Sequence, residues 1–410
     1  MLTATPLSAQ IDAQHDDRLR VLIAGAGIAG LTLAALLRRQ GLHPVLIERM
    51  PQMAHPGYML ALMPMVDAAF DEIGCHDDYV ARSTPIATYA SRSHRGRLMR
   101  SDDFSTLLAM HGEYRGIDRG ALLEVLTSDG CSVAFGTTIE AVAQMGSTTD
   151  VRFATDESPT EASFDLVVVA EGLNSRTREL LDAGEVSRVD TGWGGWVSWV
   201  DPAGVTDLGE EVWGDGFFLG AYPVQGRLGV FLGGSNHDTA VGLPEFAERV
   251  RAAAPEMGER LRAVLDGVVA SPDPYYWALT DVRAERWVTP GAVLLGDAAA
   301  GFLPTAGIGA GMAIESAWTL GRMLRDTDRS TLQPVLEEWE RVQKPRVESA
   351  QDNSRMLARL MFRRGRLIAW MRETITRMLT VRAVLGPIAR LVAAQPDPDA
   401  AAQRARVPAP

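Results

Sequence analysis

Short apolar runs alternate with glycine-rich turns near the start of the chain. Residues 21–24 are Val-Leu-Ile-Ala and run into the stretch 25–30, Gly-Ala-Gly-Ile-Ala-Gly. Leucines over 31–37 then recur at helical spacing, and a second apolar run, 44–47, ends at Glu48. A hydrophobic period that changes from strand to helix and back within about 30 residues predicts a strand, a tight turn, a helix and a second strand.

This unit has the chemistry of a dinucleotide-binding crossover. Gly25 permits the tight turn, Gly27 lets the backbone approach a pyrophosphate, and Gly30 allows close packing of the helix. The helix begins with unpaired backbone N–H groups that favour an anion. Glu48 stands where a carboxylate accepts hydrogen bonds from ribose hydroxyls. The unit alone does not distinguish NAD from FAD, because both present an ADP half to the same turn.

Two later segments are predicted to be buried strands that end in polar or glycine-rich loops. Residues 164–169, Phe-Asp-Leu-Val-Val-Val, lead into the polar loop 170–178. Residues 291–297 end in Gly-Asp, and the stretch 301–315 that follows predicts a loop and a glycine-opened helix.

The region of about 185–285 has a different character, because six of the nine tryptophans of the chain lie between positions 190 and 290. These tryptophans are Trp193, Trp196, Trp199, Trp213, Trp277 and Trp287. The segments 220–224 and 228–232 have the composition of strands. We expect a sheet whose aromatic side chains partly pack a core and partly line a pocket for a planar apolar ligand.

Residues 331–392 are predicted to be mostly helical, because apolar residues recur there at three- and four-residue steps. Over 355–390, nine arginines stand against one acid, a local charge of +8 in a chain whose net charge is −12. Such asymmetry is compatible with contact with a membrane surface. We favour helices that pack over the rest of the protein, because arginine stems also cover apolar surface.

Composition and charge narrow the class of protein. The 410 residues are 46% hydrophobic and 22% charged, which is typical of a globular protein of two or three domains. Forty basic against 52 acidic residues argue against a nucleic-acid-binding protein. Cys75 and Cys131 lack the spacing of a metal site or disulfide framework, which predicts a cytoplasmic location. No secretory signal and no membrane span are predicted.

The three motifs together resemble the group A flavin-dependent monooxygenases, the para-hydroxybenzoate hydroxylase-like family that includes FAD-dependent aromatic hydroxylases and tetracycline-inactivating monooxygenases. The resemblance covers about residues 20–345 and rests on Gly25 to Glu48-Arg49, on 171–178 and on Gly296 to Gly311. It implies an α/β fold, with a Rossmann-type FAD-binding domain, an inserted mainly β substrate domain and C-terminal helices.

The expected domain ranges follow from these segments. We expect a discontinuous FAD-binding domain over 20–185 and 286–345, and a substrate-binding β-sheet domain over 186–285. A helical region is expected over 346–395, and disordered tails are expected over 1–19 and 396–410.

The resemblance also implies which residues bind FAD: the glycine turn for the pyrophosphate, Glu48 for the adenosine ribose and Asp297 for the ribityl chain. Backbone amides after Pro304 would face the flavin ring, where donors favour the negative charge of the reduced form. The full implied set is Gly25, Gly27, Ala29, Gly30, Glu48, Arg49, Arg119, Asp297, Pro304, Gly307, Gly309, Ala310 and Gly311. The chain departs from the family pattern at Glu171, Ala300, Ile308 and Gly311.

The activity that the resemblance implies is hydroxylation of an aromatic or polyketide-like small molecule through a flavin C4a-hydroperoxide. NADPH or NADH would act as a transient reductant, since no second GxGxxG motif occurs. Three alternatives stay open: a halogenase, a related flavoenzyme that acts on a lipid or isoprenoid at a membrane, and a non-catalytic flavin-fold binding protein. The halogenase motif Trp-x-Trp-x-Ile-Pro does not fit residues 196–199.

No catalytic side chain is assigned from the sequence. Tyr222, His237, Met59 and Pro304 are candidates to line the substrate pocket, and His55 is a comparable one. No metal-binding pattern and no hydrolytic triad spacing occurs. The sequence leaves the oligomeric state open.

Overall fold

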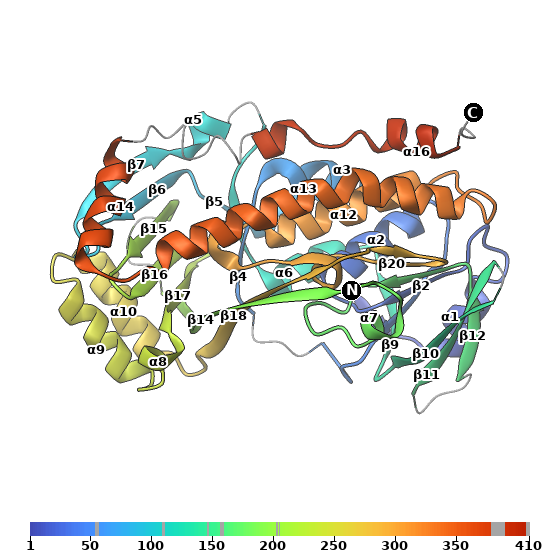
Figure 1. The fold of residues 1–410 in the computed structure, drawn as a ribbon, viewed down its shortest axis with the longest axis horizontal. Helices are drawn as coiled ribbons and strands as arrows, with labels where there is room; N and C mark the ends of the chain where they lie inside the picture. The colour runs from blue at the N-terminus through green and yellow to red at the C-terminus, as the bar shows by residue number, and fades with distance from the viewer. Residues whose placement is uncertain are drawn as a thin grey trace.

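The computed structural model describes the chain except for residues 54–56, 109–110, 146, 156–159, 202–203, 205, 379–389 and 407–410. Within the described part, two seven-stranded sheets lie toward opposite ends of the long axis. The long helix α13 (Leu332–Met361) runs along both of them (Figure 1). Positions 54–56 include His55, so this pocket candidate lies outside the described residues.

The first sheet contains the predicted dinucleotide-binding strands. Its order is β1-β9-β3-β2-β13-β20-β19, and neighbours are parallel except for β19 and β20. The strands are β1 (Leu2–Ala4), β2 (Val21–Ala24), β3 (Val45–Glu48), β9 (Cys131–Phe135), β13 (Leu166–Val169), β19 (Val288–Thr289) and β20 (Ala292–Leu294). The central strands are buried throughout because helices cover both faces of a parallel sheet. The expected Rossmann-type crossover is confirmed.

Helices pack around this sheet, and two of them begin beside its strand ends. Helix α2 (Ile28–Arg39) follows β2 directly and packs against α12 (Gly309–Met323). The shorter helices of this half are α1 (Leu7–Ala13), α3 (Asp67–Ile73), α4 (His76–Arg82), α6 (Arg119–Leu126), α7 (Thr177–Leu180) and α11 (Asp297–Ala300).

The second sheet has the order β18-β14-β17-β16-β15-β6-β7 and is antiparallel except where β15 pairs with β6. Its strands are β6 (Thr88–Arg92), β7 (Leu98–Asp103), β14 (Val186–Val200), β15 (Leu208–Trp213), β16 (Phe217–Val224), β17 (Arg227–Ser235) and β18 (Tyr275–Ala284). The predicted range 186–285 is therefore incomplete. Two strands come from residues 88–103, which the sequence assigned to the other domain, because β6 pairs with β15 across more than 100 residues of chain.

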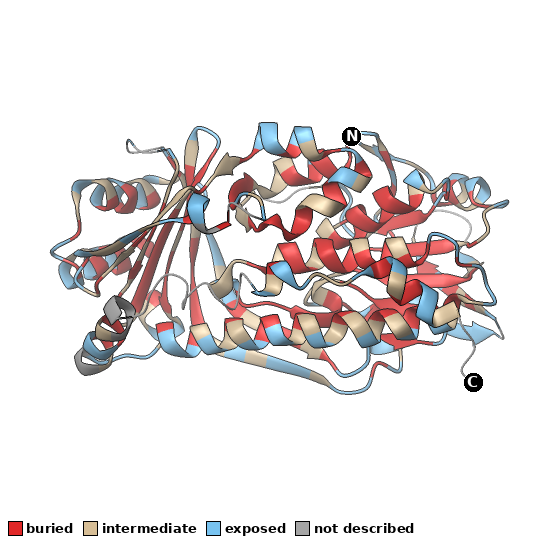
Figure 2. Ribbon diagram, turned by 90° about the horizontal axis from the view of Figure 1, so that it is seen from above, coloured by how far each residue is buried: buried red, intermediate tan, exposed pale blue. Residues whose placement is uncertain are grey.

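The two faces of the second sheet have different neighbours. Helices α9 (Leu243–Ala253) and α10 (Glu259–Ala270) cover one face and bury a separate apolar cluster that includes Val212, Leu219 and Leu232. Buried residues follow the strands and the helix faces turned toward them (Figure 2). The other face looks toward the first sheet.

Two small sheets and several short helices complete the described fold. The strands are β10 (Thr138–Met145), β11 (Thr148–Ala154) and β12 (Glu161–Phe164) in one sheet, and β4 (Met59–Leu62), β8 (Arg115–Asp118) and β5 (Thr84–Pro85) in the other. The helices are α5 (Phe104–Leu108), α8 (Asn236–Thr239), α14 (Arg366–Met378) and the 3-10 turns η1 (Pro64–Val66) and η2 (Pro304–Ala306). Across the described ranges, no helix has the length and apolar content that crossing a bilayer requires.

The predicted disorder of residues 1–19 is wrong. Residues Leu2–Ala4 form β1, which pairs in parallel with β9 at the edge of the first sheet. Helix α1 follows, and its Gln10 side chain accepts a hydrogen bond from the Leu46 backbone N–H at 2.9 Å. Polar residues in this segment hid the strand, because an edge strand of three residues has no hydrophobic pattern of its own.

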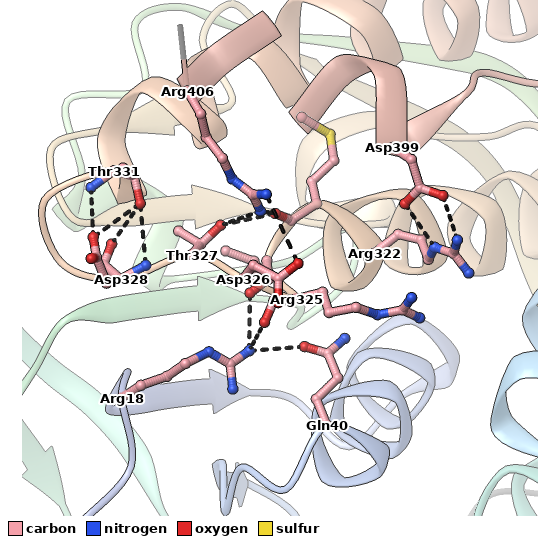
Figure 3. A network of polar contacts seen from close by, with 12 residues as sticks. Arg18, Gln40, Arg322, Arg325, Asp326, Thr327, Asp328, Thr331, Asp399 and Arg406 are labelled. Atoms are coloured by element: carbon pink, nitrogen blue, oxygen red, sulfur yellow. Dashed lines mark hydrogen bonds and ion pairs between the residues drawn. The ribbon is translucent and has the colours of Figure 1, made fainter. Parts of the chain in front are cut away.

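The predicted disorder of residues 396–410 is also wrong for the described part, since α16 (Pro398–Arg406) docks on α12 and α13. Its Asp399 carboxylate pairs with the Arg322 guanidinium, with one N···O distance of 3.1 Å (Figure 3). Arg406 donates to the Met323 carbonyl at 3.3 Å. Beside this contact, Arg18 donates to the Leu324 carbonyl at 3.1 Å (Figure 3). Tertiary contacts, rather than local propensity, order both segments: strand pairing holds residues 2–4, and an ion pair holds α16.

Arginines near the C-terminal end bind other parts of the protein. Arg355 makes a two-bond ion pair with Asp281, with both N···O distances at 2.8 Å. Arg372 is buried and donates to the Met361 carbonyl at 3.2 Å and to the Gly214 carbonyl at 3.0 Å. These contacts support the interpretation that this region braces the fold.

Candidate active site

A single cavity of about 1140 Å³ joins the first sheet to the second. Its walls include the glycine turn after β2, the segment from Asp297 to Ala310, and one face of the second sheet. Pockets for one small molecule measure roughly 300–1,000 Å³. The cavity is therefore large enough for two ligands in contact.

The glycine turn has the geometry that the sequence predicts. Gly25 has φ of 108°, and a Cβ there would lie 2.4 Å from the Ala170 carbonyl oxygen. A Cβ at Gly30 would lie 2.0 Å from the Gly25 oxygen, so this glycine serves packing and does not line the cavity. A Cβ at Gly27 would meet nothing within 4 Å, because this position opens onto the cavity. Ala29 also lines the cavity.

Glu48 and Arg49 line the cavity beside this turn. The Glu48 carboxylate accepts hydrogen bonds from the backbone N–H groups of Ala26 and Met50, both at 3.0 Å. These bonds hold the carboxylate against the glycine turn. Glu48 thus has the position that the motif predicts, at the end of β3 and over the start of α2.

The segment after β20 forms the middle of the cavity. Asp297, Pro304, Gly307, Gly309 and Ala310 all line it. Helix α12 begins at Gly309 without a side-chain cap, so its first backbone N–H groups are available to a ligand. Gly311 is not among the residues that line the cavity, and a Cβ there would lie 3.0 Å from the Met65 sulfur, so its contact with FAD stays a prediction.

Asp297 is the carboxylate of this segment. Removal from water raises the pKa of Asp297 to about 6, and desolvation is the only cause. Among the described residues, none donates a hydrogen bond to its carboxylate. A polar group in this state favours a ligand hydroxyl as its partner.

The second motif supports the cavity from behind. The Glu171 carboxylate accepts hydrogen bonds from the Thr177 backbone N–H at 3.1 Å and from the Ser175 hydroxyl at 2.7 Å. Arg178 is buried and donates to the Ala298 carbonyl at 2.9 Å. Glu171, where the family usually has Asp, therefore closes the loop of the second motif, and Arg178 connects that loop to the third motif.

Arg119 lies in the cavity wall at the start of α6. Its guanidinium carbon is 5.9 Å from the centre of the Tyr58 ring, and Tyr58 in turn packs on Trp277 with ring centres 5.5 Å apart. Burial raises the pKa of Tyr58, and the Arg119 charge opposes that shift. Arg119 thus connects the first half of the cavity to the aromatic half.

Three of the four pocket candidates line the cavity: Tyr222, Met59 and Pro304. The prediction for His237 is wrong. Its side chain is 95% exposed on α8, and it does not line the cavity. The short helix α8 follows the end of β17 and turns this histidine away from the sheet.

Three of the six tryptophans singled out in the sequence line the cavity: Trp199, Trp213 and Trp277. Trp196 belongs to the cluster under α9 and α10, and Trp287 packs on Trp339 in the other half with ring centres 5.7 Å apart. The expectation that aromatic residues both pack the core and line a pocket is confirmed.

The structure adds a polar cluster that the sequence did not reveal, which we call the Glu211 cluster: Glu211, Trp213, Tyr222, Tyr89 and Tyr114. Glu211 accepts hydrogen bonds from the Tyr222 hydroxyl and from Trp213 Nε1, the latter at 2.7 Å. Burial raises the pKa of Tyr89 and Tyr222 well above 10, and the Glu211 charge adds to both shifts. All five residues line the cavity.

No sequence signal singles out Glu211, because Glu210 precedes it in the same strand. Glu210 is buried on the opposite face and does not line the cavity. Its carboxylate pairs with Arg260 at 2.6 Å and with Arg92, which also reaches the cavity wall, at 2.5 Å. Strand alternation predicts that the two glutamates face opposite ways. Only the folded sheet, with one face covered by helices and the other bordering the cavity, shows which glutamate can contact a ligand.

Comparisons with known proteins agree with this geometry. The chain is 28% identical over 385 residues to the aurachin C monooxygenase/isomerase of Stigmatella aurantiaca, covering 88% of this chain and 94% of that protein. It is 29% identical over 360 residues to the 3-amino-4-hydroxybenzoate 2-monooxygenase of Streptomyces cremeus, with 84% and 88% covered. It is 27% identical over 385 residues to the 2-heptyl-3-hydroxy-4(1H)-quinolone synthase of Pseudomonas aeruginosa, with 88% and 94% covered.

The fold is also that of a solved flavoprotein. Klebsiella pneumoniae HpxO complexed with FAD and uric acid superposes with a TM-score of 0.82 at 20% identity, covering 94% of this chain and 99% of that chain. The FAD binding domain family matches residues 18–354, most of the chain. The chain therefore belongs to the FAD binding domain family, and its expected place among the group A flavin-dependent monooxygenases, with FAD as cofactor, is confirmed.

Proposed function

We propose that this protein uses FAD, NADPH or NADH, and O₂ to hydroxylate a small aromatic molecule. The observation that carries the proposal is the continuity of the cavity, which joins the glycine turn and Asp297 to an aromatic sheet face without a wall between them. Two ligands that occupy the two halves of this cavity would therefore be in contact with each other. Direct transfer between cofactor and substrate requires such contact.

The cavity residues fit FAD at each of its parts. Gly27 leaves open space for a pyrophosphate, and the uncapped start of α12 offers backbone donors. Asp297, a carboxylate with no protein donor, suits a ribityl hydroxyl. Glu48, Arg49 and Arg119 would hold the remaining polar groups. When bound, FAD supplies the activation of O₂ that no side chain provides.

The protein's own residues would orient the substrate and keep water away from it. Trp199, Trp277 and Phe231 give the second sheet an apolar surface for a planar ring. The Arg227 guanidinium carbon lies 3.6 Å from the centre of the Trp199 ring, and Trp199 Nε1 donates to the Gly57 carbonyl at 2.9 Å. These two contacts fix the Trp199 indole ring, so this part of the pocket wall is preformed.

The relatives support an aromatic substrate. The names of two of them specify a hydroxybenzoate and a 4(1H)-quinolone, both of which are planar rings. Neither name gives the substrate of this chain. The residues of its own pocket determine which of these rings it binds. Two buried cysteines without a disulfide are compatible with the cytoplasmic location that we propose.

The test starts from purified protein. We expect it to be yellow and to release FAD on denaturation, and we expect an aromatic ligand to stimulate NADPH or NADH oxidation. Product formed under ¹⁸O₂ should carry one labelled oxygen atom. A colourless protein that does not take up FAD would favour a binding protein, and unlabelled product would favour a reductase or dehydrogenase.

A further inference from the structure

We propose that Glu211 is a substrate-binding residue that selects an uncharged ring with an N–H or O–H donor and rejects aromatic carboxylates. This inference rests on the proposed function and adds the class of substrate. It is carried by the placement of one carboxylate, its neutral hydrogen-bond donors and its position beside the Asp297–Ala310 segment.

The register of the second sheet directs Glu211 into the cavity. Glu211 pairs with Gly220 of β16 and with Ser91 of β6. The absence of a side chain at Gly220 leaves room for the Tyr222 ring, whose hydroxyl donates to the Glu211 carboxylate. Residues one position away, Glu210 and Val212, face the helices instead. The strand therefore commits Glu211 to the ligand side.

The partners of Glu211 are neutral. Tyr222 and Trp213 each donate a hydrogen bond to one of its two oxygens. In the described part of the chain, no arginine, lysine or histidine forms an ion pair with this carboxylate. A carboxylate accepts about four hydrogen bonds, so these two leave it able to accept another from a ligand.

The cations of this part of the cavity already have partners. Arg92 pairs with Glu210 at 2.5 Å, and Arg100 pairs with Asp102 at 2.6 Å. Arg372 donates to backbone carbonyls at the edge of the cluster. Glu211, whose hydrogen-bond donors are neutral, is thus a negative charge on this part of the cavity wall that makes no ion pair with these arginines.

The phenols of the cluster remain donors. Burial first, and then the negative charge of Glu211, raises the pKa of Tyr89 and Tyr222 well above 10, so both stay protonated. A substrate carboxylate here would face Glu211 and lose water without gaining a cation, which disfavours its binding. A neutral N–H or O–H would instead form a hydrogen bond to a charged acceptor.

The Glu211 cluster lies next to the segment that we assign to FAD. The Tyr89 ring stacks on Phe104 at 5.2 Å, and Phe104 packs on Tyr114 at 6.0 Å. The Tyr114 hydroxyl would lie 3.5 Å from a Cβ at Gly307. A ring held by Glu211 would therefore lie close to the η2–α12 loop.

An apolar wall lies beside the cluster. Arg372 donates to the carbonyls of both Trp213 and Met361, which ties the end of α13 to the strand of Glu211. The wall consists of Met356, Leu357, Leu360, Met361 and Phe362. A ring donor at Glu211 and an alkyl substituent on this wall match a 2-alkyl-4(1H)-quinolone, the ring type in the name of one relative, better than a benzoate.

The experiment measures binding to the FAD-loaded protein through the change in flavin absorbance. The probes are 2-heptyl-4(1H)-quinolone, its N-methyl derivative, which lacks the donor, and 3-amino-4-hydroxybenzoate. We expect the wild type to bind the N–H compound about tenfold or more tightly than the other two. Glu211→Gln should reduce that preference to about threefold or less and keep FAD bound. Glu248→Gln, an exposed charge removal on α9, should leave it unchanged.

Equal binding of the N–H and N-methyl compounds by the wild type, or tighter binding of the benzoate, would overturn the inference. A preference that survives intact in Glu211→Gln would also overturn it, because steric exclusion of the methyl group would then be the cause. The binding assay requires no turnover. A protein that selects the N–H ring but oxidises no NADPH or NADH would therefore contradict the proposed function and leave the inference standing.

Discussion

The two faces of the second sheet give one residue type two different roles. Glu210 and Glu211 are adjacent in β15, yet Glu210 is ion-paired with two arginines on the face that α9 and α10 cover. Glu211 faces the cavity and has only neutral donors. Removal of a buried carboxylate from its cations destabilises a fold, because the cations stay buried without a partner, whereas a carboxylate beside a cavity that has no cation is available to a ligand. The two glutamates therefore have different roles because their hydrogen-bond and ion-pair partners differ.

The largest expected effect lies on the covered face. Glu210→Ala should lower the free energy of unfolding by about 3 kcal/mol, because Arg92 and Arg260 would lose their shared partner while staying largely buried. Urea denaturation of the FAD-loaded protein measures this loss. Glu248→Ala, at an exposed position, should cost less than about 0.5 kcal/mol. A loss for Glu210→Ala as small as that of Glu248→Ala would remove the contrast between the faces.

The next effect concerns ligand binding at the cavity. Asp297→Asn should weaken FAD binding about tenfold at pH 8, because a ribityl hydroxyl would lose a charged acceptor. In the wild type, FAD affinity should fall as the pH drops through about 6, where the Asp297 carboxylate becomes protonated. A fluorescence titration of FAD from pH 5 to pH 8 measures both. The variant should show a flatter pH profile.

The stability of Asp297→Asn gives the matching control. The pKa of Asp297 is raised to about 6 in the fold, above its ordinary value of 3.8, so the charged form costs the FAD-free protein stability above pH 6. Asp297→Asn should therefore be at least as stable as the FAD-free wild type at pH 8. A large loss of stability would mean that the carboxylate has a structural role like that of Glu210.

A smaller effect is expected from the tyrosines of the two faces. Tyr222→Phe removes a donor to Glu211 and should cost about 1 kcal/mol of stability while raising the KM for the preferred aromatic ligand. Tyr276→Phe is the control outside the cavity, since its hydroxyl bonds to Thr239 at 2.8 Å and its half-exposed ring packs on Trp196. We expect it to change stability by a similar amount and KM hardly at all. An equal rise in KM for both variants would contradict a separate role for the cavity face.

The smallest effect is expected for the arginine-rich end. Arg355 and Arg372 are bound within the fold, as Arg260 is, so they are not available to an outer surface. We expect the FAD-loaded protein to stay in the supernatant when anionic liposomes are sedimented. Each exposed arginine near such a surface would contribute about 1 kcal/mol to binding. Salt-sensitive co-sedimentation would restore the alternative of a substrate taken from a membrane.

The sequence predicted the dinucleotide half of the site well. Gly25, Gly27 and Glu48 occupy the positions that their spacing implies, because a strand, a turn and a helix joined within 30 residues form through local contacts. The substrate half was predicted only as an aromatic sheet. His237 was misplaced, since a polar residue at a strand end gives no indication of which way the next turn points.

The sequence by itself determined the Rossmann-type crossover, the family and the aromatic character of residues 186–285, because each depends on residue types at short spacing. Only the tertiary structure decided that β1 pairs with β9, that β6 joins β15, and that Glu211 rather than Glu210 faces the cavity. Each of these depends on a partner far away along the chain. Strand alternation determines that the side chains of two adjacent residues point to opposite faces of the sheet. Which segments cover each face is determined only when distant parts of the chain pack together.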